Sequence, residues 1–298
     1  MRPPLGLRPP GGSRARAISG RLLRRPLAGF YSAVDIRQGI FDSPWNGFNN
    51  FRYFFSSGDA ATIVFNTVFL NALFLSASLL AGLVLALMIN EIRGGLYRRF
   101  TQSIIFFPYF VSPIVISIML QVILSGVGGR GGALNNLLSI IDIPQVVWYT
   151  TADAWPWILT FVKVWQLGGY TSIIFLAAIT SISEEIYEAA AIDGASRWRM
   201  ALSITTPLLL PTFAILVVLG VGRMFFGDFA TIYAIIQDNG TLFPTTDVID
   251  TYVFRSLRTS GDFGTTAAIG MFQSVVGLVF VTAAVLVQRR VHKESAIL

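Results

Sequence analysis

The chain has 298 residues, of which 54% are hydrophobic and only 13% are charged, and its mean hydropathy is +0.65. Soluble domains carry about 25% charged residues, so this composition excludes an ordinary cytosolic enzyme and a disordered protein. The formal net charge is +6, which invites a nucleic-acid interpretation. However, residues 1–25 contain seven arginines and no acid. The rest of the chain is nearly neutral, and we expect no nucleic-acid partner.

Several kinds of chemistry are also excluded. There is no cysteine, and His292 is the one histidine, so we expect neither a disulfide nor a metal site. The two lysines, Lys163 and Lys293, do not follow a glycine-rich loop with P-loop spacing. We therefore predict that the chain is not an enzyme, binds no cofactor and has no catalytic residues.

Apolar segments long enough to cross a bilayer predict an all-α, polytopic membrane protein. A spanning helix needs about 20 apolar residues. Lys163 is the single charge in the third predicted span, and Arg223 is the single charge in the fourth. Residues 134–143 are too short to span and predict an amphipathic piece of an external loop. The five predicted spans are residues 62–90, 100–125, 154–183, 200–227 and 263–288.

The basic residues predict the orientation of these spans. Residues 91–99, 184–199 and 289–293 hold eight lysines and arginines in short segments, against five on the opposite side. Cytoplasmic loops carry such an excess, so we assign these three segments to the cytoplasm.

The arginine-rich tail, residues 1–29, conflicts with this orientation because it precedes an external segment, residues 30–61. One explanation is that a first helix near residue 26 is missing. The other is that the tail stays inside and residues 26–39 cross irregularly. We favour the first, because unpaired backbone groups in lipid are costly. We therefore separate the tail from a transmembrane domain of residues 30–298.

The most charged cytoplasmic stretch lies within residues 184–207. Ser183 followed by two acids predicts a helix start, and Gly194 predicts a stop or tight turn. A second helix is then expected, leading into Pro207 and Pro211. The stretch is either an ordinary loop between two spans or a rigid docking element for a cytoplasmic partner.

This stretch resembles the EAA signature of binding-protein-dependent ABC importer permeases. The signature is Glu-Ala-Ala, three residues, Gly, nine residues, Ile, one residue and Leu-Pro. The chain has Glu188-Ala189-Ala190, Gly194, Ile204 and Thr206-Pro207, so only the Leu is replaced. The spacing is kept over 20 residues, in the cytoplasmic loop where the signature belongs.

Three further segments resemble the polysaccharide (LplB-like) branch of the maltose-type sugar permeases, which have the fold of type I ABC importers. They are SPWNGFNNFRYFF at residues 43–55, DVIDTYVFRSL at residues 247–257 and GMFQSVVGLVFVTAAVLVQRR at residues 270–290. Members of that branch carry an extra helix before the first of these segments, which makes six spans. A missing first helix would also explain why the arginine-rich tail precedes an external segment.

The resemblance implies a permease subunit in the bacterial cytoplasmic (inner) membrane that imports oligosaccharides, including acidic ones. It implies a second permease subunit in a heterodimer, an extracytoplasmic substrate-binding protein and two ATPase subunits that bind ATP and Mg²⁺. Glu188 would pair with a basic ATPase residue, Ala189 and Ala190 would allow close packing, and Asp193 and Gly194 would form the turn. ATP-driven closure of the ATPases would switch the spans from inward-open to outward-open.

Polar residues inside spans are expensive and are candidate ligand contacts. Sugars need converging hydrogen-bonding groups and aromatic faces. The alternative for the amides is contact between helices, and for Lys163 it is snorkelling to the external surface. The candidates are Asn66, Asn71, Gln121, Lys163, Trp165, Gln166, Tyr170, Arg223, Asp228, Tyr233 and Gln273.

Arg223 and Asp228 lie about 140° apart on a straight helix, so they are poor partners there. Glycines at positions 220, 222 and 227 would break this helix locally, as suits a gate or cavity wall. Outside the membrane, residues 43–55 and 238–262 predict short helices and turns, which either seat the binding protein or cap helix ends. Residues 126–136 predict a flexible turn.

Two other functions stay open at this point. A secondary transporter or channel would show repeats, interrupted helices and buried ionisable pairs, and would not need the stretch from Glu188 to Gly194. An ABC permease for another solute, such as peptides or phosphate, would share the EAA signature. The resemblance of the last 50 residues favours a sugar.

Overall fold

The computed structural model describes residues 45, 47–125 and 131–291. The predictions for residues 1–29, for the crossing at residues 26–39, for residues 126–130 of the predicted turn and for His292 and Lys293 lie outside these residues. The prediction of a flexible turn over residues 126–136 is wrong for its last part, because a helix begins at Ala133. The chain divides into two compact units. One comprises Met1–Ala60 with Val253–Gln273, and the other comprises Ala61–Tyr252 with Ser274–Leu298.

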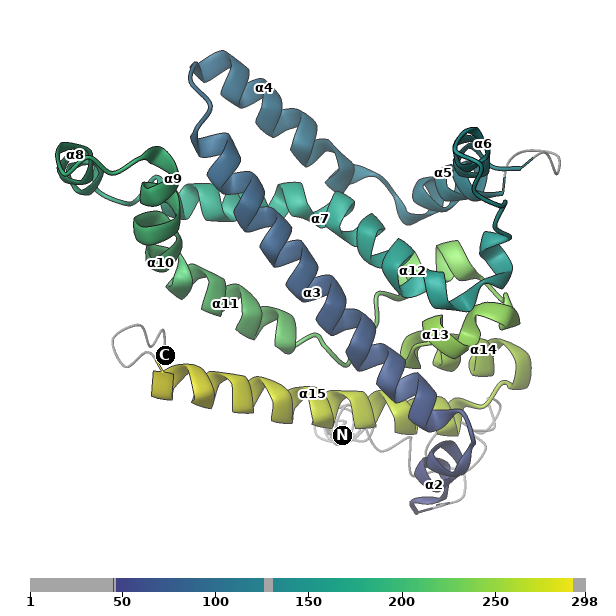
Figure 1. Cartoon of the computed structure of the whole chain (residues 1–298). Helices are drawn as coiled ribbons and strands as arrows, with labels where there is room; N and C mark the ends of the chain where they lie inside the picture. The colour runs from purple at the N-terminus through teal and green to yellow at the C-terminus, as the bar shows by residue number, and fades with distance from the viewer. Residues whose placement is uncertain (1–44, 46, 126–130, 292–298) are drawn as a thin grey trace, which may run out of the picture. The chain divides into compact units, whose positions relative to one another are not determined.

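The described residues form an all-α fold, as predicted (Figure 1). The helices are α2 (Asn49–Ser56), α3 (Ala60–Asn90), α4 (Gly95–Phe106), α5 (Pro113–Leu124), α6 (Ala133–Ile140), α7 (Trp155–Ile179), α8 (Glu184–Ile192), α9 (Arg197–Met200), α10 (Thr206–Leu208), α11 (Leu210–Val221), α12 (Phe229–Ile236), α13 (Phe243–Thr246), α14 (Ile249–Ser260) and α15 (Phe263–Val291). A π-helical turn, Ala201–Thr205, joins α9 to α10. Short 3₁₀ turns include η2 (Phe107–Phe110) and η3 (Trp148–Thr150).

Three helices are long and apolar enough to cross a membrane: α3, the segment Ala152–Ile179 that contains α7, and residues Phe263–Gln288 of α15. The other two predicted spans are bent pairs, so the described residues contain up to five crossings. In the second span, the axis turns by 95° between Gly95–Phe110 and Pro113–Leu124. In the fourth, it turns by 53° between Arg197–Leu208 and Leu210–Val221.

The prediction of one continuous span over residues 100–125 is therefore wrong. Pro108 lies inside the 3₁₀ turn, and Pro113 opens α5 with Ser112 in an extended conformation before it. A proline removes a backbone donor and disfavours the helical conformation in the residue before it. The hydropathy of the segment shows none of this, because both halves are apolar.

In the second unit, α7 is the best-covered span, with 56% of its apolar window buried against 33% for α3. Two apolar clusters lie along these helices. One surrounds Leu70, Phe74, Trp155 and Leu159, and the other surrounds Leu79, Ile89, Phe175 and Ile179. Residues of α3 and α7 that lie between the clusters are thus left free to form a polar site.

Gly169 permits the close packing of α7 against α4. A Cβ atom at this position would lie 2.0 Å from the backbone oxygen of Ile105. Small residues at helix contacts in membranes allow backbones to approach in this way. The contact holds α4 beside the middle of α7 and so positions the turn that follows α4.

The helix expected at residues 200–227 stops at Val221, and α12 begins only at Phe229. The predicted break near the glycines is thus present. Asn71 of α3 donates from Nδ2 to the backbone oxygen of Met224 at 3.0 Å, and the backbone N–H of Gly227 donates to the Asp250 carboxylate. These contacts satisfy backbone groups that the break exposes.

The first unit contains α2 and the beginning of α15. The rings of Phe55 and Phe272 meet edge to face, with centroids 5.0 Å apart. Phe54 and Gln273 are buried in this unit. The short helices expected within residues 43–55 and 238–262 are present as α2, α13 and α14, whereas their contact with a binding protein stays a prediction.

Candidate functional site

A cavity of about 490 Å³ lies in the second unit between α3, α7, α11 and the turn before α12. It occupies the level between the two apolar clusters. Predicted candidates from three segments meet here: Asn71, Lys163, Tyr170, Arg223 and Asp228. We call this space the central cavity. Its lining residues are Asn71, Phe74, Leu75, Ser78, Leu79, Tyr109, Lys163, Leu167, Tyr170, Thr171, Ile174, Leu216, Gly220, Arg223, Phe226, Gly227 and Asp228.

Lys163 is buried and fully partnered. Its ammonium forms an ion pair with Asp228 and donates to Gln166 Oε1 and Thr231 Oγ1, each at 3.1 Å. An ammonium has three donors, so these partners use all of them. The snorkelling alternative is therefore wrong, because Lys163 is only 7% exposed and its ammonium pairs with Asp228.

Arg223 contributes a different kind of charge to the central cavity. It is exposed, and no acidic group within the described residues lies within ion-pair distance of its guanidinium. Since Asp228 is taken by Lys163, the cavity retains one uncompensated positive charge. A planar guanidinium binds a carboxylate through two parallel hydrogen bonds.

Aromatic faces line the same cavity. Tyr109 and Tyr170 stack with centroids 4.8 Å apart and an interplanar angle of 12°, and Phe106 stacks on the other side of Tyr109 at 5.6 Å. Sequence reasoning found Tyr170 but missed Tyr109. That residue was hidden in an apparently straight span, and its role depends on the 3₁₀ turn η2 that directs it toward α7.

Ser78 is a second residue that sequence reasoning missed. It is 5% exposed, lines the central cavity, and its hydroxyl has no hydrogen-bond partner within the described residues. Buried polar groups are nearly always partnered. A hydroxyl left unpaired at a cavity wall is therefore a candidate ligand contact, although no periodicity in α3 distinguishes it from helix-stabilising serines.

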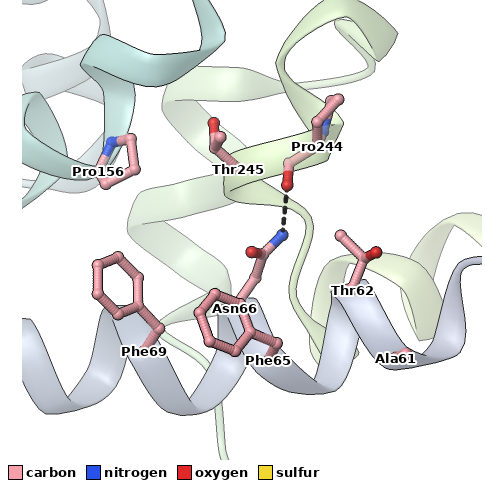
Figure 2. A pocket seen from close by; sticks show the side chains of 8 residues that line it. All are labelled: Ala61, Thr62, Phe65, Asn66, Phe69, Pro156, Pro244 and Thr245. Atoms are coloured by element: carbon pink, nitrogen blue, oxygen red, sulfur yellow. Dashed lines mark hydrogen bonds between the residues drawn. The ribbon is translucent and has the colours of Figure 1, made fainter.

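Asn66 holds protein structure together outside the central cavity. Its Nδ2 donates to the backbone oxygens of Pro244 at 3.1 Å and Asp247 at 3.2 Å, at the end of α13. Figure 2 shows Asn66 pointing from α3 toward Pro244, with Phe69 on one side and Thr62 on the other. This contact fits the alternative in which the amide joins helices.

The remaining candidates are dispersed. Gln166 positions Lys163 and donates to the backbone oxygen of Val111 at 3.3 Å. Tyr233 stacks on Phe229 with centroids 5.2 Å apart. Trp165 is partly exposed without lining the central cavity, Gln121 lies in a separate cavity near the end of α5, and Gln273 belongs to the first unit.

At the opposite end of α7 from η3, the charged stretch forms the predicted helix, turn and helix (Figure 1). The Ser183 hydroxyl accepts from the backbone N–H of Glu185 and caps α8. Gly194 has φ +75°, and the N–H groups of Gly194 and Ala195 donate to Ala191 and Ala190. This is a Schellman motif, which ends a helix sharply.

No residue of α8 is buried. Glu188, Ala189, Asp193 and Gly194 are exposed, and Ala190 is half-buried. Ile192 is 87% exposed and Trp198 is 74% exposed. Beside α8 lies a cavity of about 680 Å³ whose lining includes Glu91, Arg98, Glu184, Glu188 and Arg197. An exposed helix with apolar and charged side chains in this arrangement is suited to docking a protein partner.

Tyr187 connects α8 to the π-helical turn. Its hydroxyl lies 2.9 Å from Thr205 Oγ1, and Thr205 is almost completely buried. Single π-helical turns inside α-helices are frequent at functional sites. A displacement of α8 would therefore reach the bent pair of α10 and α11 through this contact.

Comparison with known proteins identifies the architecture. The model of the family described as "Binding-protein-dependent transport system inner membrane component" matches residues 78–293. The chain is 32% identical over 258 residues to "Protein LplB" of Bacillus subtilis (strain 168), covering 86% of this chain and 79% of that protein. It is 30% identical over 246 residues to "Polygalacturonan/rhamnogalacturonan transport system permease protein YteP" of the same organism, covering 83% and 75%.

Solved structures agree. A chain of the crystal structure of a bacterial ABC transporter involved in the import of the acidic polysaccharide alginate superposes with a TM-score of 0.77 and 32% identity, covering 93% of this chain and 95% of that chain. The same transporter type in complex with an alginate pentasaccharide-bound periplasmic protein gives a TM-score of 0.78 at 31% identity, covering 94% and 95%.

Proposed function

This chain belongs to the family of binding-protein-dependent transport system inner membrane components, and we propose that it is the permease subunit of an ATP-driven importer of acidic oligosaccharides. Membership in this family decides against a secondary transporter or channel. The single observation that supports the substrate class best is Arg223, an uncompensated cation in a cavity with stacked aromatic rings.

The central cavity has the groups that an acidic sugar requires. The ring faces of Tyr109 and Tyr170 suit the apolar side of a sugar ring, and the unpaired hydroxyl of Ser78 suits a sugar hydroxyl. Arg223 would bind the carboxylate. Two similar proteins support this class, since one is named for polygalacturonan and rhamnogalacturonan and another belongs to an importer of alginate.

The partners follow from the family and from the exposed helix α8. An extracytoplasmic binding protein would deliver the oligosaccharide, as in the similar alginate complex. Two ATPase subunits would bind ATP and Mg²⁺, and a second permease subunit would complete the pathway as a heterodimer. We place the assembly in the bacterial cytoplasmic membrane, with α8 on the cytoplasmic side.

In this mechanism α8 is a coupling helix. Glu188 would pair with a basic ATPase residue, Ala189 and Ala190 would allow close contact, and Asp193 with Gly194 would fix the turn. Closure of the ATPases would move α8, and the contact between Tyr187 and Thr205 would transmit the movement to the bent fourth span. The central cavity would thereby open to one side of the membrane at a time.

The substrate assignment predicts a selective effect of Arg223→Gln. A hydrogen bond to a charged group contributes about 1.5–3 kcal/mol, so uptake of an acidic oligosaccharide should fall by roughly tenfold to a hundredfold. Uptake of a neutral oligosaccharide should not fall. The measurement is uptake of labelled alginate and maltose-type oligosaccharides into proteoliposomes that contain the whole transporter and its binding protein.

Arg99→Gln is the matched control, because it removes an exposed arginine that lines neither the central cavity nor the cavity beside α8. It should leave uptake of both sugars unchanged. Equal uptake of the acidic sugar by Arg223→Gln and the wild type would rule out Arg223 as the carboxylate contact. Transport of neutral sugars alone by the wild type would overturn the acidic class.

A further inference from the structure

A second cavity of about 310 Å³ lies where α12 ends, and it includes the predicted candidate Gln121. We call it the outer cavity, because Tyr149 of η3 lines it and η3 lies at the end of α7 opposite to α8. It is separate from the central cavity, and no residue lines both. Its lining residues are Ser117, Gln121, Tyr149, Ile235, Ile236, Gln237, Asp238 and Asn239.

Gln237 occupies a backbone conformation that favours glycine, with φ +53° and ψ −133°. The backbone N–H of Asn239 donates to the oxygen of Ile236 at 3.2 Å. These values place Gln237 at the second position of a type II′ turn, where glycine is preferred. Strained residues of this kind cluster at binding sites, where the strain is tolerated for the sake of the side chain.

The outer cavity combines fixed walls with free polar groups. Ser117 Oγ donates to the backbone oxygen of Ala234 at 2.6 Å, and Asn239 Nδ2 donates to that of Tyr149 at 2.8 Å. By contrast, the side-chain amides of Gln121 and Gln237 make no hydrogen bond within the described residues. Two amides together offer four N–H donors and two acceptor oxygens to a ligand.

Tyr149 adds an aromatic wall. Its ring packs against Trp155 with centroids 4.9 Å apart, which fixes its orientation. Burial raises the pKa of the Tyr149 phenol above its ordinary value. The hydroxyl therefore stays protonated at neutral pH and can donate a hydrogen bond.

We propose that the outer cavity is a second oligosaccharide subsite, in which Gln121, Gln237 and Tyr149 bind hydroxyl groups of a sugar unit distant from the unit held in the central cavity. This inference rests on the proposed function. The two amides and the phenol that would form the subsite are neutral groups. The subsite therefore recognises the hydroxyl edge of a unit, and its contribution depends on chain length rather than on charge.

The two cavities are joined by α12. Asp228 precedes the first residue of α12 in the central cavity, and Gln237 follows its last residue in the outer cavity. Nine residues at 1.5 Å each separate the two positions by about 13 Å along the helix. A chain of several sugar units is long enough to span this distance, whereas a disaccharide in the central cavity is too short to reach the outer cavity.

The test is the length dependence of uptake by Gln237→Gly in the complete transporter with its binding protein. Glycine relieves the turn, so the thermal midpoint should equal or exceed that of the wild type. Uptake of alginate pentasaccharide should nevertheless fall by about tenfold, as expected for the loss of one or two hydrogen bonds. Uptake of alginate disaccharide should change by less than about twofold on the same grounds.

Asp142→Gly is the matched control, because Asp142 also has a positive φ of 56° and does not line the outer cavity. It should relieve strain without changing uptake of either sugar. Gln121→Met removes a second amide at nearly constant volume and should repeat the length-selective loss of Gln237→Gly. The two variants of the cavity thus test the subsite independently of the turn.

Two outcomes would overturn the subsite, and a third would overturn the backbone strain assigned to Gln237. Uptake of pentasaccharide equal to the wild type in both Gln237→Gly and Gln121→Met shows that the amides bind no sugar. An equal loss for both sugar lengths, with weaker docking of the binding protein, shows a protein-contact surface instead. A lower thermal midpoint for Gln237→Gly contradicts the strain. Failure of the wild type to take up either sugar would instead overturn the proposed function.

Discussion

The ion pair between Lys163 and Asp228 defines what the central cavity can bind. It neutralises two charges inside the membrane-spanning region, and it joins α7 to the broken helix that precedes α12. The sequence predicted both residues as part of the pathway but compared Asp228 only with Arg223 on the same helix. The pairing with Lys163 depends on the path of residues 222–228, which no helical periodicity describes.

Substituting Lys163 by Met should destabilise the protein. Removing one partner of a buried pair leaves the other charge unpaired, which costs about 3–5 kcal/mol in fully buried cases. The Asp228 side chain keeps 28% exposure, so part of its charge stays hydrated and we expect a smaller loss of about 2–3 kcal/mol. The measurement is thermal unfolding of the purified subunit in detergent.

The double variant Lys163→Met with Asp228→Leu supplies the control, since it removes both charges. It should regain most of the stability lost by Lys163→Met, because apolar replacements of a buried pair are often neutral. If the single and double variants unfold at the same temperature, the pair does not hold α7 and α12 together.

At the scale of elements, the sequence predicted those features that depend on a few neighbouring residues, such as the start and the end of a helix. The start of α8 at Ser183 and its end at Gly194 depend on residues within one helical turn, and both predictions are confirmed. The bends at residues 107–112 and near Leu209 were missed as bends, although the prolines were visible. Composition alone does not distinguish a straight span from two apolar helices that meet at 95°.

The turn at Gly194 predicts that Gly194→Ala uncouples the transporter. The residue has φ +75°, a conformation that costs an L-residue about 1–2 kcal/mol. The strain should tilt α8, and stimulation of ATP hydrolysis by the loaded binding protein should fall several-fold. Because nothing packs within 4 Å of the position, the new methyl group causes no clash, and the loss of stability should not exceed this strain of about 1–2 kcal/mol.

Gly95→Ala is the matched control for this substitution. Gly95 is also open to its surroundings, but its φ is not positive. It is the first residue of α4, directly after the short loop that contains Arg93. Its replacement should leave the stimulation of ATP hydrolysis unchanged. Equal stimulation in Gly194→Ala, Gly95→Ala and the wild type would show that the turn does not position a coupling helix.

At the scale of the whole molecule, the sequence predicted the membrane class and the family correctly, and its five crossings are the upper count that the described residues allow. The cavity was harder to predict, because it gathers side chains from α3, η2, α7 and residues 220–228. Five of the eleven candidates meet there, and the rest are dispersed. An intramembrane amide carries the same sequence signal whether it binds a ligand or, as Asn66 does, another helix.

The central claim is that one chain connects a sugar cavity to an ATPase docking helix, so that import is driven by ATP. The measurement is accumulation of labelled alginate oligosaccharide in proteoliposomes that contain the whole transporter, with loaded binding protein outside and ATP inside. We predict accumulation against the gradient that requires ATP and is insensitive to ionophores. Accumulation without ATP, or its collapse when ion gradients are dissipated, would contradict the proposed function.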